Sequence, residues 1–79
     1  MNIQLIGPDS LREFQAEWLE VITHSGSRVI LPGHEPFVEQ LATQKPIVMK
    51  MPGGAIKTIP LEGGVLSVMR DAVLIVLEG

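Results

Sequence analysis

The chain has 79 residues, of which 46% are hydrophobic and 19% charged, with a net charge of −3 and no cysteine. This composition excludes a disordered chain, which would combine low hydrophobicity with high net charge, and a disulfide-stapled scaffold. The negative charge argues against a nucleic-acid partner, and no apolar run approaches the roughly 20 residues that span a bilayer. A chain of this length forms one domain over residues 1–79. Because the sequence is unusually apolar for this size, we expect some apolar surface to be left for a partner.

Residues 2–6 form a short apolar run that ends at the turn signature Gly7-Pro8-Asp9. In such a turn, proline fixes φ and aspartate can hydrogen-bond its own backbone. Val and Ile each occur eight times in the chain, and these β-branched residues favour a pleated, half-buried surface. The first run is therefore predicted to be a strand.

Residues 10–23 fit two different structures. A helix is favoured by periodicity, because Ser10 and Glu13 match a capping box and the apolar residues fall at helical spacing. The apolar residues of this pattern are Leu11, Phe14, Trp18, Val21 and Ile22. The alternative is a pair of short strands, with one face formed by Phe14, Ala16 and Trp18 and the other by Leu19, Val21 and Thr23.

The rest of the chain alternates between apolar runs of strand length and turn residues. Strands are predicted at residues 46–51, 55–59, 65–69 and 72–77, with turns at Pro52-Gly53-Gly54, Gly63-Gly64 and Arg70-Asp71. The last run has no polar alternation, so we expect both of its faces to be covered. Short strands with turns at this spacing predict an all-β sandwich or barrel.

The most distinctive stretch is residues 29–37, Val-Ile-Leu-Pro-Gly-His-Glu-Pro-Phe. Residues 30–37 resemble the epsilon subunit of F-type ATP synthases, in which a strand ends in Ile-Leu-Pro-Gly-His-x-Pro before an apolar residue. Upstream, Gly7-Pro8-Asp9 and Phe14-Gln15-Ala16-Glu17 resemble that family's first turn and its Phe-x-Gly-x segment. Downstream, residues 61–68 resemble its Gly-Gly-Phe-x-x-Val block, and residues 73–77 resemble its closing strand. The blocks follow one another in the same order over nearly the whole chain.

The resemblance implies a flattened sandwich of short antiparallel strands, with strands instead of a helix over residues 10–23. It also implies a non-catalytic rotor subunit that links the gamma subunit to the c-ring and couples ion transport to ATP synthesis. Such a subunit would lie at the cytoplasmic face of the bacterial inner membrane without inserting into it. The apolar surplus would then form a gamma-binding sheet face.

The same resemblance implies which residues meet the partners. The loop from Ser25 through His34 occupies the family's c-ring position, so we expect Ser27, Arg28 and His34 to contact the c-ring. Glu39 is expected to lie near both gamma and the ring.

The sequence departs from the family pattern in two places. Where the family has Gly-Glu-Phe-Gly, this chain has Gly26-Ser27-Arg28-Val29, which removes an acid and adds a cation opposite the basic loops of the c-ring. Either the partner ring differs, or Glu35 and Glu39 supply the acid. The family's C-terminal helical hairpin is also absent, so we expect no ATP site and no inhibitory function, whether the chain is naturally short or truncated.

Two other functional interpretations remain open. The altered Ser27-Arg28-Val29 segment also suits a stand-alone β-sandwich adaptor that binds a different protein. A metal or acid–base site could draw on His24, His34 and the acids near them, but the spacing matches no metal-binding motif. We therefore expect no metal, no cofactor and no catalytic residues. Trp18 is expected to belong to the core, with a place on the gamma-binding face as the alternative.

Overall fold

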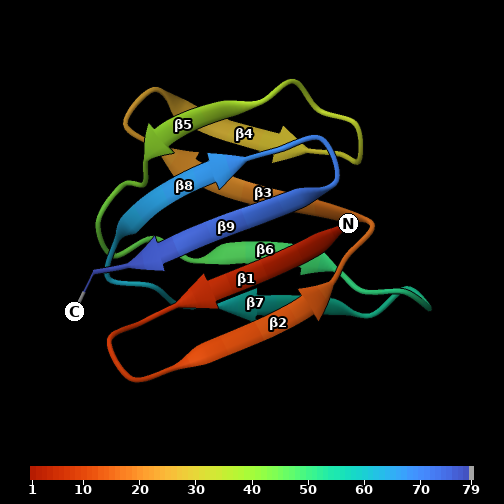
Figure 1. Ribbon diagram of the computed structural model, residues 1–79, viewed down its shortest axis with the longest axis horizontal. Helices are drawn as coiled ribbons and strands as arrows, with labels where there is room; N and C mark the ends of the chain where they lie inside the picture. The colour runs from red at the N-terminus through yellow and green to blue at the C-terminus, as the bar shows by residue number, and fades with distance from the viewer. Residues whose placement is uncertain (79) are drawn as a thin grey trace.

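Residues 1–78, which the computed structural model describes, fold into strands joined by turns and short loops (Figure 1). The strands are β1 (Asn2–Ile6), β2 (Leu11–Gln15), β3 (Trp18–Thr23), β4 (Gly26–Ile30), β5 (Phe37–Gln40), β6 (Ile47–Lys50), β7 (Ile56–Ile59), β8 (Gly64–Val68) and β9 (Ala72–Leu77). Within this part of the chain no helix could cross a membrane.

The strands form two sheets stacked face to face. The five-stranded sheet, in front in Figure 1, has the order β2-β1-β9-β8-β5, and the four-stranded sheet behind it has the order β4-β3-β6-β7. Among the paired strands of residues 1–78, β1 and β9 run parallel and the other pairs are antiparallel. The domain measures 30 × 25 × 17 Å. The predicted flattened all-β sandwich is therefore confirmed, with β1–β9 as a parallel exception.

The core lies between the two sheets and is built from every second residue of the strands. In β1, Ile3 and Leu5 are fully buried while Gln4 between them faces outward, as the two-residue period of a strand requires. The largest fully buried side chains come from both sheets: Ile3, Leu5, Leu19, Val21, Ile30, Ile47, Met49, Leu66, Val68, Val73 and Ile75. One face of each sheet is therefore excluded from water.

Residues 10–23 form two strands in different sheets, so the helix predicted from periodicity is wrong. The chain crosses between the sheets at Ala16 and Glu17, whose amides donate to the carbonyl oxygens of Met1 (3.0 Å) and Lys50 (2.7 Å). Buried residues recur every two positions in β3 but are three apart across the crossover, from Ala16 to Leu19. The apparent helical spacing instead combines the buried Val21 with Leu11, which is exposed, and with the half-buried Phe14, Trp18 and Ile22, so it does not mark one buried face.

The prediction that Trp18 belongs to the core is wrong, and the prediction that both faces of the last strand are covered is not met by residues 1–78 themselves. Trp18 is only half-buried and does not belong to the core, because its neighbour Leu19 takes the core-facing position of β3. In β9, Val73 and Ile75 are buried, but Val76 is 48% exposed. The apolar run of β9 therefore has one face that no described residue covers.

The hairpin between β6 and β7 has the predicted turn at Pro52-Gly53-Gly54. The Met51 amide donates to the Ala55 carbonyl oxygen (2.7 Å), and the Gly54 amide donates to the Met51 carbonyl oxygen (3.0 Å). Gly53 and Gly54 have φ angles of 93° and 100°, a backbone region that glycine adopts without steric cost.

We expect Leu5→Ala to lower the free energy of unfolding by about 2–5 kcal/mol, because it opens a cavity in a fully packed core. Leu11→Ala is the matched control, since Leu11 is 58% exposed on the adjacent strand, and it should cost less than about 0.5 kcal/mol. Urea unfolding followed by circular dichroism measures both. Equal losses in the two variants would contradict this core.

Candidate protein-interaction site

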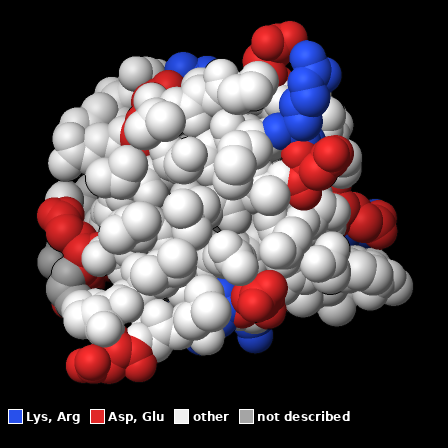
Figure 2. All heavy atoms as spheres, viewed as in Figure 1, with Lys and Arg blue, Asp and Glu red and all other residues white. Residues whose placement is uncertain are grey.

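The outer face of the five-stranded sheet carries few charges. Figure 2 views the molecule from this side and shows acidic and basic groups gathered near the rim, with an uncharged area between them. Three valines of this sheet are strongly exposed: Val38 (68%), Val65 (46%) and Val76 (48%). Val65 and Val76 are cross-strand neighbours, and Ile6 is the register partner of Val76 on the other side.

We call Ile6, Val38, Val65, Leu74 and Val76 the outer valine face. The four on β1, β8 and β9 project away from the core because they alternate with buried residues, and Val38 is on the exposed side of β5. Val65, Val76 and Ile6 form a row across three strands, and exposed apolar surface of this kind is suited to protein contact. Part of the apolar surplus predicted from the sequence is thus located on the five-stranded sheet, while Val29 and Ile56 are exposed on the four-stranded sheet.

A second feature closes one open side of the sandwich. β4 is an edge strand of the four-stranded sheet and β5 is an edge strand of the other. Arg28 of β4 reaches across to Glu39 of β5, with 2.6 Å between its Nη2 and Glu39 Oε1. The guanidinium carbon also lies 5.3 Å from the centre of the Phe37 ring, within the range of a cation–π contact.

The surroundings of Glu39 favour its ionised form. The Thr23 hydroxyl beside it does most to hold the pKa of the Glu39 carboxyl below its usual range, and the Arg28 hydrogen bond and charge act in the same direction against the opposing effect of burial. Thr23 Oγ1 itself donates to the Gly26 carbonyl oxygen at 3.0 Å. Glu39 Oε2 is buried, and within residues 1–78 it has no hydrogen-bond partner.

The loop at residues 31–36 follows β4 and is tied to this cluster by His34. The imidazole ring lies 5.2 Å from the Phe37 ring, and its Nδ1 donates to the Glu35 carbonyl oxygen at 2.8 Å. The Gly33 amide donates to the Arg70 carbonyl oxygen (2.7 Å), which attaches the loop to the turn between β8 and β9. Gly33 has a φ of 81°, a value that suits glycine.

The structure brings three of the four sequence-predicted contact residues together. Arg28, His34 and Glu39 all lie around Phe37. Ser27 points the other way, on the outer face of β4, and its hydroxyl lies 3.5 Å from Glu20 Oε2.

The segment from Ser25 through His34 is not a continuous loop, because Gly26–Ile30 pairs with β3 as strand β4. Phe37 was not among the contact residues expected from the sequence. Its position two residues before Glu39, on the same side of a strand, is the signal that could have identified it.

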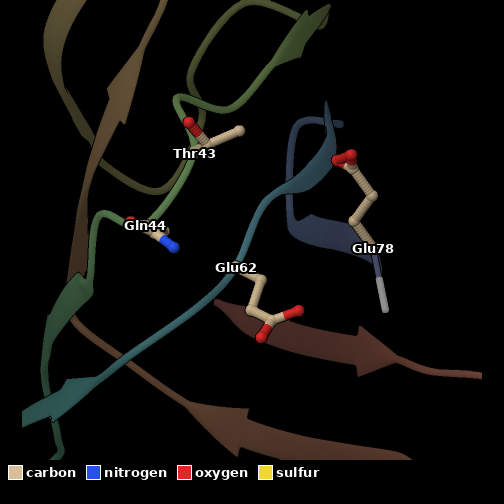
Figure 3. Close-up of a pocket in the computed structure, with 4 residues that line it drawn as sticks. All are labelled: Thr43, Gln44, Glu62 and Glu78. Carbon is tan, nitrogen blue, oxygen red and sulfur yellow. The ribbon is translucent and has the colours of Figure 1, made fainter.

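An open depression of about 500 Å³ lies elsewhere, lined by Thr43, Gln44, Glu62 and Glu78 (Figure 3). These side chains come from different segments and are all exposed. The described lining holds no lysine, arginine, histidine or cysteine. No group of three or more potential metal ligands occurs among the residues that the structure describes, and none of the sequence-predicted contact residues lines this depression.

Two stacked sheets of short strands with an uncharged outer face define a β-sandwich domain that offers a surface for protein contact. The chain belongs to the family described as ATP synthase, Delta/Epsilon chain, β-sandwich domain, whose model matches residues 1–79. The resemblance to the epsilon subunit is therefore confirmed.

Solved structures give the same fold. A chain of the mitochondrial ATP synthase of Euglena gracilis, determined by cryo-electron microscopy with OSCP, F1 and the c-ring, superimposes with a TM-score of 0.86 at 24% sequence identity. The match covers 95% of the present chain and 48% of that chain, so this domain spans about half the length of its structural relative. No protein with a curated description matches the sequence.

We expect Arg28→Met to raise the pKa of Glu39, because the variant removes a hydrogen bond and a positive charge that both lower it. The pair stabilises the fold above the ordinary glutamate pKa of about 4.3, and this contribution disappears as the pH falls through the lower pKa of the folded state. The variant should therefore lose less stability than the wild type on acidification.

Carboxyl NMR titration and urea unfolding at several pH values measure these effects. Arg12→Met, which removes one positive charge from β2, is the matched control and should leave Glu39 unchanged. An unaltered Glu39 titration in Arg28→Met would show that the ion pair does not form in solution.

Proposed function

We propose that this domain belongs to a non-catalytic central-stalk subunit that links the gamma subunit of an ATP synthase to its c-ring. Membership of the delta/epsilon family supports the assignment to an ATP synthase. The observation that carries the finer proposal is the outer valine face, because it gives the domain an apolar surface suited to a permanent partner. In this role the domain transmits torque and needs no chemistry of its own.

The outer valine face is the proposed gamma contact. Its centre is uncharged and charges gather near its rim (Figure 2), which is the layout of a protein interface, in which charges are depleted from the fully buried part. The β9 strand supports the same proposal, since its outward residues Leu74 and Val76 are as apolar as its buried ones. A strand with two apolar faces is typical of a sheet that is covered on both sides.

The side of the domain formed by β4 and the 31–36 loop is the proposed c-ring contact. Ser27 lies on the outer face of β4, and His34 lies in the loop. Val29 and Leu31 lie between them in the chain and are 54% and 53% exposed. These residues form a second surface, at a different side of the domain from the centre of the outer valine face, as a link between two partners requires.

The proposed location follows from that assembly. A subunit between gamma and the c-ring is peripheral to the membrane, on the side where F1 lies. The cytoplasmic face of a bacterial inner membrane is part of this proposal, whereas the solved relative comes from a mitochondrial enzyme. Whether protons or sodium ions drive the complex depends on its c-ring.

We expect Val76→Asp to weaken binding to gamma by at least about tenfold, because it places a charge in the apolar centre of the interface. Ile56→Asp is the matched control, since Ile56 is 58% exposed on the four-stranded sheet, and it should leave gamma binding unchanged. Calorimetric titration of gamma measures the affinities, and circular dichroism confirms that both variants fold.

A wild-type domain that fails to bind gamma at micromolar concentration would overturn the proposal. The alternative of a stand-alone adaptor, suggested by the Ser27-Arg28-Val29 departure, would then be favoured. If the gene lies next to that of an ATP synthase beta subunit, this would instead support the proposed role as a rotor subunit.

A further inference from the structure

We propose that Arg28 is a positioning residue that supports the 31–36 loop through contacts within the domain and does not itself contact a partner. The part of this inference that concerns the c-ring rests on the function proposed above. The part that concerns the loop rests on the contacts of Arg28 alone.

The direction of the Arg28 side chain follows from the register of β4. Arg28 lies opposite Val21 and two residues before Ile30, and both of these are fully buried. Because strand side chains alternate, Arg28 projects to the core side of its sheet while Ser27 and Val29 project outward. Its side chain stays 43% exposed because β4 is an edge strand.

From this position Arg28 connects β4 to the loop through side chains. Its guanidinium bonds to Glu39 and lies over one ring of a tilted aromatic pair, in which the planes of Phe37 and His34 meet at 58°. His34 is itself a loop residue, and its amide donates to the Leu31 carbonyl oxygen at 3.1 Å. Removing the guanidinium therefore removes the contact that holds the Phe37 ring. The His34 ring, which packs against Phe37, then loses part of its support.

The positive charge of Arg28 is paired within the domain with the carboxylate of Glu39. Glu39 Oε2 is shielded from water without a hydrogen-bond partner among residues 1–78, so the nearby guanidinium compensates a carboxylate that would otherwise be poorly solvated. The residues exposed to a partner along the outer side of β4 are then the uncharged Ser27, Val29 and Leu31.

This arrangement explains how the chain accommodates a cation where its family has an acid. An arginine that is paired with an internal carboxylate presents little net charge to the basic loops of a c-ring. The salt dependence of binding at this side should then not depend on Arg28, because its charge is already paired within the domain.

The first test uses the domain by itself and measures amide hydrogen exchange by NMR. Arg28→Met should accelerate exchange at Gly33 and His34 by about tenfold, the combined effect of losing a cation–π contact and an ion pair. Arg28→Lys, which keeps the charge, should restore most of the protection. Arg12→Met is the control with the same loss of charge and should leave both amides unchanged.

Wild-type exchange rates at Gly33 and His34 in Arg28→Met would overturn the proposal. If that variant fails to fold, Glu39→Gln gives the same readout, because it removes the charge that holds the guanidinium and should also accelerate exchange in the loop.

The second test measures binding to the assembled gamma–c-ring complex at several salt concentrations. Arg28→Met should weaken binding while leaving its salt dependence as in the wild type. A reduced salt dependence would show that Arg28 contacts the partner directly and would contradict the inference. If the loop loosens as expected but the wild-type domain does not bind the complex, the proposed function fails and the positioning role of Arg28 stands.

Discussion

Each sheet of this domain can bury only one of its faces, and the other properties of the structure depend on that constraint. The two sheets cover each other, and the described chain supplies no third layer to cover them from outside. In β9, Val73 and Ile75 face the core while Leu74 and Val76 face away from it, although all four are apolar. Hydrophobic residues that the core does not use therefore lie on the outer face of this sheet, where they give the domain a surface suited to a protein partner.

A two-layer sandwich also has two open sides, and this one closes both with a cation over a phenyl ring. Arg28 covers Phe37 at 5.3 Å on the side of β4 and β5, and Lys57 covers Phe14 at 5.7 Å on the side of β7 and β2. A contact of this kind contributes about 0.5–1 kcal/mol at an exposed site, and the long side chain shields the edge of the core from water. Among residues 1–78, Arg28 forms an ion pair, with Glu39, and Lys57 forms none, so the loss of Arg28 should remove an ion pair as well as packing.

The sequence predicted the strands well where turn residues delimit them, as at Pro52-Gly53-Gly54 between β6 and β7. Periodicity alone failed on residues 10–23 and on Trp18, because the apolar residues at helical spacing belong to two strands of different sheets and do not all face the core. The resemblance to the epsilon family corrected the first of these errors. The pairing of Arg28 with Glu39 could not be predicted locally, since it depends on which edge strands of the two sheets face each other.

The central claim is that gamma covers the outer valine face. Methyl-labelled NMR spectra of the domain, recorded with and without gamma, test it most directly, because valine methyl groups lie on both outer faces of the sandwich. We expect binding to shift or broaden the methyl signals of Val38, Val65 and Val76 and to leave those of Val29 and Val48 on the four-stranded sheet in place. Perturbation of Val29 and Val48 alone, or of neither set, would contradict it.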